Sequence, residues 1–429
     1  MLETNTISKA PVLIAGGGIG GMAMALTLHQ IGVPCVVLEA VPALQPLGVG
    51  INLQPNAVRE LYELGLDDTV LDRIGIQARE WALVGRNGRE IYAEPRGLAA
   101  GYRWPQYSVH RGELQMLLYR AVRERLGPDA VRLGQRVTGY RNHERRRDRA
   151  RSKRRDGRRR EVRGAPAGGR RRPALGRARA DAPAAAAHPL GRRHHVARHH
   201  AGRADPHAAR LSSAWAASGT AWSATRSPGP TRPPAWRRST GSPRSRWTTP
   251  TAGRQGDWNR RVAVDEFIHH FEGWNYGWID VPALLRGASQ VFEYPMIDRD
   301  PVPTWVDGRV ALLGDAAHVM YPVGSNGASQ AIVDARVLGA ALEQHGVGPA
   351  ALRAYDDRLC ADISALVLRN RGAGPFGLLG LVDERCGGVF DDIDQVVPKA
   401  EREAFMARYK AAAGFAIETL NAAVPTVRV

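Results

Sequence analysis

The clearest chemical pattern in the sequence is a cluster of glycines near the N-terminus. Gly16, Gly18 and Gly21 have the G-x-G-x-x-G spacing, directly after the apolar run 12–14 and before a helical stretch. Such glycines allow a tight turn and a close approach to a pyrophosphate, and the helix N-terminus adds free N–H groups. Glu39 follows Gly21 by 18 residues, where a carboxylate can accept from a ribose hydroxyl. The pattern predicts dinucleotide binding but does not choose between FAD and NAD.

A second pattern lies far along the chain. The apolar strand predicted over 310–313 ends in Gly314 and Asp315, and a turn containing Pro322 and Gly324 then leads into a helix expected to run toward Leu342. A carboxylate at a strand end can face a polyol, and the free N–H groups of a helix start can stabilise negative charge on a reduced flavin ring.

Together the two patterns resemble the fingerprints of the class A FAD-dependent aromatic monooxygenases, the family of the para-hydroxybenzoate hydroxylase type. The loop 48–51 resembles the one beside the flavin ring, and Arg111 resembles the arginine that contacts the FAD ribose and phosphate. Segments 46–52, 107–116, 294–296 and 298–300 are similar in particular to phenazine hydroxylases that act on 5-methylphenazine-1-carboxylate. The resemblance covers roughly residues 8–142 and 256–375.

The resemblance implies an enzyme in which NAD(P)H reduces FAD and the reduced flavin takes up O2 as a C4a-hydroperoxide. That group then hydroxylates a small aromatic, possibly phenazine-like, substrate. The flavin carries the chemistry, so no catalytic side chain is assigned with certainty and no metal is expected. Pro322 and Gly324 are expected near the flavin ring. The residues expected to bind the cofactor are Gly16, Gly18, Gly21, Glu39, Gly50, Arg111, Asp315, Pro322, Gly324, Gly327 and Ala328.

Three further side chains are candidates for a role in the reaction. His110 and His318 could suggest a catalytic base, but this chemistry does not require a histidine base, so we expect both to be structural. Tyr321 precedes the glycine-containing turn and is a candidate for substrate contact.

These residues require an α/β fold. We expect a Rossmann-type FAD-binding domain around a mixed sheet, a second, antiparallel-sheet substrate domain that is partly disrupted, and a helical C-terminal part. The FAD-binding domain is predicted in three parts, 1–79, 111–142 and 301–372, with substrate-sheet strands in 80–110 and 256–300. The C-terminal helical part is 373–429, and the remaining segment is 143–255.

Charge is concentrated in the middle of the chain. The formal net charge is +18, yet residues 141–255 carry 30 Lys and Arg against 6 Asp and Glu, which leaves 30 basic and 36 acidic residues elsewhere. An alternative is therefore a basic nucleic-acid-associated protein. No zinc spacing or regular aromatic interleaving accompanies the arginines, so no nucleic-acid partner is expected.

Localisation is predicted from three widely spaced cysteines and from the lack of a signal peptide. No apolar run approaches the about twenty residues that span a bilayer. We therefore expect no membrane partner and a cytoplasmic monomer or homodimer.

Segment 143–255 is rich in Arg, Ala, Pro and Gly, and such a composition buries little apolar area. The family's middle fingerprint, Ala-Asp-Gly followed by Ser-x-x-Arg, is missing from it. Reading permitted codons for 168–180 one nucleotide out of frame restores Ala-Asp-Gly-Val-Gly-Leu-His-Ser-Ala-Val-Arg-Ala, and two further windows, 193–200 and 236–248, recover strand-like sequence. We therefore hypothesise a frameshifted, disordered segment, and a second alternative is an inactive relic of such an enzyme.

Overall fold

The structure is a computed structural model that describes residues 10–142, 195–197, 260–288, 291–296, 298–413 and 417–428. The hypothesis of a frameshift within 143–255, and the missing middle fingerprint, fall outside the described residues except for 195–197.

The N-terminal unit is the predicted strand, turn, helix and strand. Strand β1 (Val12–Ala15) is followed by helix α1 (Ile19–Gln30) and strand β2 (Cys35–Leu38). β1 and β2 pair in parallel, and β2 also pairs in parallel with β8 (Val131–Arg132). A mixed sheet was expected, and the described strands of this sheet are all parallel. The βαβ prediction is confirmed.

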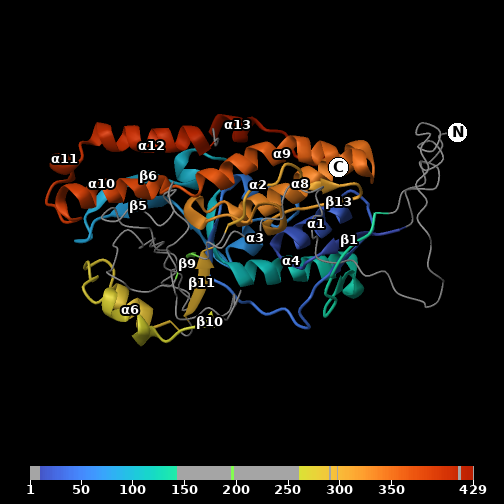
Figure 1. Ribbon diagram of the computed structural model, residues 1–429, viewed down its shortest axis with the longest axis horizontal. Coiled ribbons are helices and arrows are strands. Elements are labelled where there is room, and N and C mark those ends of the chain that lie inside the picture. Colours follow the sequence, from blue (N-terminus) through green and yellow to red (C-terminus); the bar gives the residue numbers. More distant parts are fainter. Residues whose placement is uncertain are drawn as a thin grey trace, which may run out of the picture.

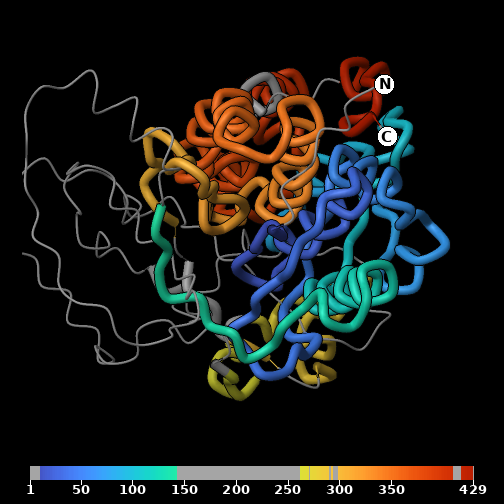
Figure 2. The backbone as a smooth tube through the Cα atoms, turned by 90° about the vertical axis from the view of Figure 1, so that its right-hand side faces the viewer, coloured from blue at the N-terminus to red at the C-terminus, as the bar shows by residue number. Residues whose placement is uncertain are grey.

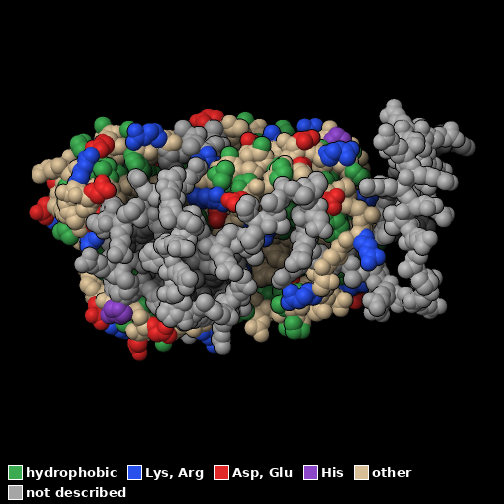
Figure 3. Space-filling model, in the orientation of Figure 1, with side chains coloured by type: hydrophobic (Ala, Val, Ile, Leu, Met, Phe, Trp, Pro, Cys, Tyr) green, Lys and Arg blue, Asp and Glu red, His purple; other side chains and the backbone are tan. Residues whose placement is uncertain are grey.

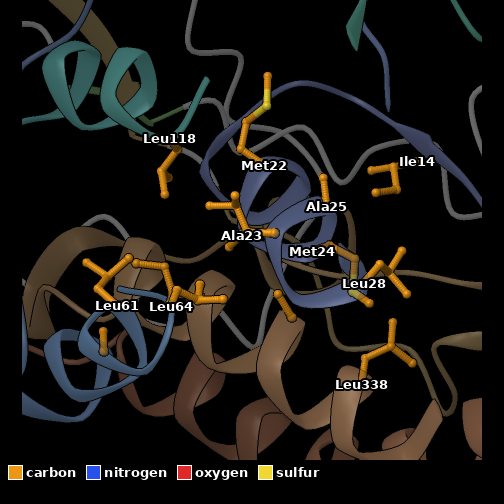
Figure 4. Packing of buried hydrophobic residues seen from close by; sticks show 14 of the residues in the cluster. Ile14, Met22, Ala23, Met24, Ala25, Leu28, Leu61, Leu64, Leu118 and Leu338 are labelled. Atoms are coloured by element: carbon orange, nitrogen blue, oxygen red, sulfur yellow. The ribbon is translucent and has the colours of Figure 1, made fainter. Parts of the chain in front are cut away.

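Helix α1 lies at the centre of the main core. Its residues from Met22 to Leu28 are all buried, because other helices cover it on several sides. These are α2 (Pro55–Glu63), α4 (Arg111–Leu126) and α8 (Gly327–His345), the last followed by α9 (Pro349–Arg369). In Figure 4 Leu61, Leu118 and Leu338 converge on α1. Each such leucine contributes about 1.5–3 kcal/mol when fully buried.

A second sheet is antiparallel and has β7 (Gln106–His110) in its middle. β7 pairs with β3 (Gly50–Leu53) on one side and with β4 (Gly75–Ala78) on the other. Because both sides of β7 are paired, its first four residues are buried. α4 follows β7 directly, so this sheet fixes where α4 begins.

The C-terminal helices pack against a hairpin from early in the chain. β5 (Glu80–Val84) and β6 (Glu90–Pro95) form the hairpin, and a short helix α3 (Asp68–Leu71) precedes it. The helices are α10 (Gly377–Cys386), α11 (Ile393–Val396) and α12 (Lys399–Ala413), which lie on the hairpin side in Figure 1. The last helix, α13 (Ile417–Ala422), lies beyond α12 toward α9, and its Asn421 Nδ2 donates to Gly101 O at 2.8 Å. One apolar cluster joins hairpin and helices: Leu83, Ile91, Leu378, Leu379, Val382, Phe390, Val397 and Met406.

A third group of elements lies at the opposite side from α12 in Figures 1 and 2. It contains α6 (Val281–Arg286), β10 (Arg260–Arg261), β11 (Phe292–Met296) and β9 (His195–Ala197), with β11 between β10 and β9. Its small separate core includes Phe267, Phe271 and Trp274, whose rings meet edge to face.

The chain returns to the main core through a short hairpin of β12 (Val306–Asp307) and β13 (Val310–Ala311). The strand was predicted to extend to Leu313. It is shorter, because among the described residues it pairs only with the two-residue β12, and Leu312 adds one bond to Trp305 O at 2.9 Å. The one-turn helix α7 (Asp315–His318) and a 3-10 turn, Pro322–Gly324, lead to α8 as predicted.

A buried charge network fixes α8 against α2. The Arg336 side chain, at 0% exposure, donates to Glu60 Oε2 and Glu63 Oε2, both at 3.1 Å. Thr426 near the C-terminus donates to Glu60 Oε1 at 2.6 Å. A buried guanidinium is tolerated only when its donors are paired, so these bonds set the position of α8 along α2.

The described surface is electrically mixed. Figure 3 shows acidic and basic side chains interspersed on the face that it presents. Within the described ranges no helix combines the length and apolar character needed to cross a membrane.

Candidate active site

The glycine turn at the start of α1 is as tight as its sequence predicts. Gly16 has φ +111, and a Cβ on Gly21 would lie 2.0 Å from Gly16 O, which excludes any side chain there. No side-chain cap bonds the first turn of α1, whose N-cap is Gly18. Uncapped N–H groups at a helix start favour a bound anion such as a pyrophosphate.

Glu39 lies at the end of β2, directly beside this turn. Its Oε2 accepts from Gly17 N at 2.6 Å and its Oε1 accepts from Val41 N at 2.9 Å. Both bonds fix the carboxylate, and the side chain stays half-buried. A carboxylate held in this way can still accept from a ribose hydroxyl through its remaining lone pairs.

Helix α4 brings Arg111 to the same turn. Gln115 Nε2 donates to Gly17 O at 2.8 Å, and Arg111 lies one helical turn before Gln115, so the two share a helix face. Arg111 N donates to Val49 O at 2.9 Å, and the Arg111 side chain is exposed. Sequence reasoning did not assign Gln115, although its spacing from Arg111 is a signal that could have found it.

Gly50 lies in β3 and pairs with His110, the residue before Arg111. The same strand reaches the start of α8. Asn52 Nδ2 donates to Ser325 Oγ at 3.4 Å, and Gln54 N donates to Ser329 Oγ at 3.0 Å. The structure therefore brings Gly50 and Arg111 beside the second predicted pattern.

The turn before α8 is strained. Ser325 follows the 3-10 turn with φ 55, the only positive φ at a described residue other than glycine. Such conformations cost of order 1–3 kcal/mol and persist where the surroundings impose them. α8 begins at Gly327 and Ala328, and its N-cap Asn326 makes no side-chain cap bond. Its first N–H groups can therefore stabilise negative charge.

Asp315 is exposed at the first position of α7, after Gly314 with φ 58. Close to Asp315, the first turn of α1 packs against the segment before α7 and against α8. A Cβ added to Gly20, in the first turn of α1, would lie 2.7 Å from Leu313 and 3.3 Å from Ala331. Such close packing places the Gly314–Asp315 turn next to the N-terminal glycine turn.

Asp334 belongs to the second sequence pattern, after Gly327, but the sequence assigned it no role. Its Oδ2 accepts from Gly314 N at 2.8 Å and lies 2.6 Å from His318 Nε2, while its Oδ1 accepts from Gln330 Nε2 at 2.9 Å. The residue is 0% exposed. An acidic residue in the middle of an apolar helix was the signal that could have identified it.

Both histidines have structural surroundings, as expected. His110 is the N-cap of α4, where its Nδ1 accepts from Glu113 N at 3.3 Å, and burial lowers its pKa. Burial also opposes protonation of His318, but the charge and hydrogen bond of Asp334, together with a backbone hydrogen bond and the charge of Asp315, leave the pKa of His318 raised. Tyr321 is half-buried and its carbonyl accepts from Asn370 Nδ2 at 3.4 Å.

The site residues fit FAD chemically. A glycine turn and an uncapped helix start suit a pyrophosphate, Glu39 and Asp315 are acceptors for ribose and ribityl hydroxyls, and a second uncapped helix start suits a reduced flavin. Among the described residues no group of His, Cys, Asp and Glu could hold a metal ion.

Comparison with known proteins agrees with this chemistry. The model of the FAD binding domain family matches residues 9–165 and 282–369. The chain is 38% identical over 393 residues to the phenazine 1,6-dicarboxylic acid hydroxylase PhzS of Lysobacter antibioticus, covering 85% of this chain and 90% of that protein. It is 30% identical over 411 residues to 3-hydroxybenzoate 6-hydroxylase 1 of Aquipseudomonas alcaligenes, covering 88% and 93%.

Solved structures show the same fold. A salicylate hydroxylase substrate complex matches with a TM-score of 0.52 at 18% identity, covering 96% of this chain and 98% of that one. HpxO of Klebsiella pneumoniae, complexed with FAD and uric acid, matches with a TM-score of 0.51 at 22% identity, covering 97% and 98%. By its family match and its relatives, the chain belongs to the FAD binding domain family, among the FAD-dependent aromatic monooxygenases that use NAD(P)H as co-substrate.

Proposed function

We propose that this monooxygenase uses O2 to hydroxylate a small aromatic acid of the phenazine carboxylate class. The observation that carries the substrate class is the 38% identity to a phenazine 1,6-dicarboxylic acid hydroxylase over 90% of that protein. Relatives at about 30% identity have names that refer to hydroxybenzoates, so single-ring acids are the competing substrates.

The roles of the site residues are part of the proposal. The N–H groups around Gly16, Gly18 and Gly21 bind the pyrophosphate, with Arg111 as its counter-charge. Glu39 accepts from the ribose hydroxyls, and Asp315 accepts from the ribityl chain. FAD, when bound, supplies electron transfer from NAD(P)H and oxygen activation.

The remaining residues shape the flavin end. Gly50 leaves room for the ring beside β3, and Pro322 and Gly324 form the turn that faces it. The start of α8 at Gly327 and Ala328 stabilises negative charge on the reduced ring. Tyr321 precedes this turn and is a candidate for substrate contact.

Domain roles and assembly are also proposed. Segments 80–110 and 256–300 cover the substrate, and 1–79, 111–142 and 301–372 form the FAD-binding part. Within the described ranges Cys35, Cys360 and Cys386 are free thiols, which suits a reducing cytoplasm. The expected assembly is a monomer or homodimer.

The test is turnover by the full chain. Purified protein is mixed with FAD, then with NADH or NADPH in air, and with phenazine-1,6-dicarboxylate or 3-hydroxybenzoate. We expect a bound-flavin spectrum that bleaches faster with the phenazine, and a product that has gained one oxygen atom. Bleaching that no aromatic compound accelerates, or faster hydroxylation of the benzoate, would contradict the proposed substrate class.

A separate experiment tests whether segment 143–255 affects the activity. Resequencing the gene, and expressing a chain with the frame restored across 143–255, separates the family function from the state of this chain. If only the restored chain binds FAD, the activity belongs to the restored enzyme and the chain as written is the inactive relic. An intact single frame that translates as written, with a folded product, overturns the frameshift hypothesis.

A further inference from the structure

A buried carboxylate holds both ends of the short turn that carries Asp315. Asp334 Oδ2 accepts from Gly314 N at 2.8 Å and lies 2.6 Å from His318 Nε2. Gly314 is the N-cap of α7 and His318 is its last residue. One oxygen atom therefore fixes the first and last residues of a turn whose second residue, Asp315, is exposed.

The turn has few other restraints. Gly314 has φ 58 and ψ −139, outside the common regions for residues with side chains. Within the turn, Ala317 N and His318 N both donate to Gly314 O at 2.9 Å. These bonds close the turn on itself. Arg299 Nη1 donates to Ala316 O at 3.4 Å, and the centre of the Trp305 ring lies 5.4 Å from that of the His318 ring, so the turn also contacts the segment before β13. Among the described residues, the side-chain hydrogen bonds that join this turn to α8 are those of Asp334.

We propose that Asp334 is a positioning residue that holds the Gly314–His318 turn so that Asp315 faces the bound cofactor. This inference rests on the proposed role of Asp315 in binding the FAD ribityl chain. Asp334 does not touch the cofactor itself, because its carboxylate is 0% exposed and its oxygens are used by Gly314, His318 and Gln330.

The surroundings of His318 support a permanent pairing with Asp334. The charged groups near the imidazole are Asp334 on α8, Asp315 on α7 and the guanidinium of Arg299, which donates to Ala316 O at 3.4 Å. The Trp305 ring packs against the imidazole. Asp356 accepts from the backbone N of Trp305 at 2.8 Å and so holds the residue whose ring packs against His318. Asp334 Oδ2 can only accept at 2.6 Å, so His318 Nε2 carries a hydrogen and donates to it, whereas the buried Nδ1 has no hydrogen-bond partner among the described residues.

The first test needs no cofactor. Amide hydrogen exchange of the full chain without FAD is compared between wild type and Asp334→Ala. We expect the peptide that spans Gly314 to His318 to exchange at least about tenfold faster in the variant, with other helices little changed. Gln330→Ala is the matched control, because it removes a bond to Oδ1 and leaves both Oδ2 contacts in place. Unchanged exchange in Asp334→Ala overturns the proposal.

The second test is a double-mutant cycle on FAD affinity, measured by quenching of flavin fluorescence on the folded fraction. We expect Asp315→Ala and Asp334→Ala each to raise the Kd by about tenfold, and the double variant to be little weaker than Asp315→Ala. If the two losses multiply, Asp334 acts independently of Asp315 and the proposal fails. If Asp315→Ala alone leaves the Kd unchanged, the proposed role of Asp315 fails instead.

A conservative variant covers the case in which Asp334→Ala does not fold. Asp334→Asn keeps one oxygen that can accept from Gly314 N, so we expect a folded chain with a Kd raised about threefold. The same cycle is then run with this variant. A loss that persists in the Asp315→Ala background contradicts the proposal, and a loss that disappears there supports it.

Discussion

At each end of the proposed FAD site a carboxylate accepts a hydrogen bond from a glycine N–H, but the two carboxylates differ in burial. Glu39 Oε2 accepts from Gly17 N at 2.6 Å, and Asp334 Oδ2 accepts from Gly314 N at 2.8 Å. Glu39 is half-buried, whereas Asp334 is 0% exposed. Water can replace a lost partner of Glu39 but not one of Asp334, so the buried carboxylate has three protein partners.

The two carboxylates differ in burial because they bind different kinds of turn. Glu39 steadies a turn that belongs to one local βαβ unit, which glycine conformations already shape. Asp334 lies on α8 and fixes a turn that the short β12–β13 hairpin alone would leave loosely held. Long-range anchoring of a functional loop requires a buried group, and burial makes that group costly to remove.

The largest expected effect is the loss of folding when a side chain is added inside the N-terminal glycine turn. In Gly21→Ala the new Cβ would lie 2.0 Å from Gly16 O, so we expect little or no folded protein, judged by circular dichroism and thermal unfolding. Gly18→Ala is the matched variant, because no atom lies within 4 Å of its Cβ. It should fold with a near-normal Tm and bind FAD more weakly, since the methyl group occupies the pyrophosphate approach. A well-folded Gly21→Ala chain would contradict this account.

The second-largest expected effect is the loss of stability when the buried carboxylate of Asp334 is removed. We expect Asp334→Ala to lower the free energy of unfolding by about 3 kcal/mol, because it leaves His318 and Gly314 N without a buried partner. Urea unfolding followed by tryptophan fluorescence measures this. A loss no larger than that of Glu39→Ala would remove the distinction between the two ends.

A smaller loss is expected at the half-buried end. Glu39→Ala removes acceptors from Gly17 N and Val41 N, which water can partly replace, so we expect about 1 kcal/mol. Its FAD affinity should fall further than its stability suggests, because the ribose contact is also lost. Calorimetric FAD titration beside urea unfolding separates the two effects, and an FAD affinity equal to wild type would count against the ribose role.

The smallest effect is a pH dependence confined to the buried end. Burial disfavours the charged imidazole, but Asp334, Asp315 and a backbone hydrogen bond together raise the pKa of His318 above its ordinary value of 6.5. The folded state therefore binds the proton more tightly than the unfolded state, so this stabilisation is full below pH 6.5 and is lost as the pH rises through the higher folded pKa. The difference in unfolding free energy between wild type and His318→Gln should shrink with rising pH. A difference that grows instead would mean that His318 is neutral in the folded chain.

Much of the fold could be predicted from the sequence because its patterns are local. The spacing of Gly16, Gly18 and Gly21 between two apolar strands defined the βαβ unit, and the helix after Pro322 begins at Gly327 as expected. Reasoning from short segments also explains why the length of one strand was predicted wrongly. An apolar run to Leu313 predicted a long strand, but a strand lasts only as far as its partner, and β12 has two residues.

The sequence by itself determined which residues are proposed to face FAD, because glycine conformations and strand-end carboxylates are properties of short segments. Only the tertiary structure decided what holds them. It placed Gln115 of α4 on Gly17 O, and Asp334 of α8 on Gly314 N and His318. Those contacts depend on how α1, α4 and α8 pack around one core, and no spacing along the chain encodes a distance across that core.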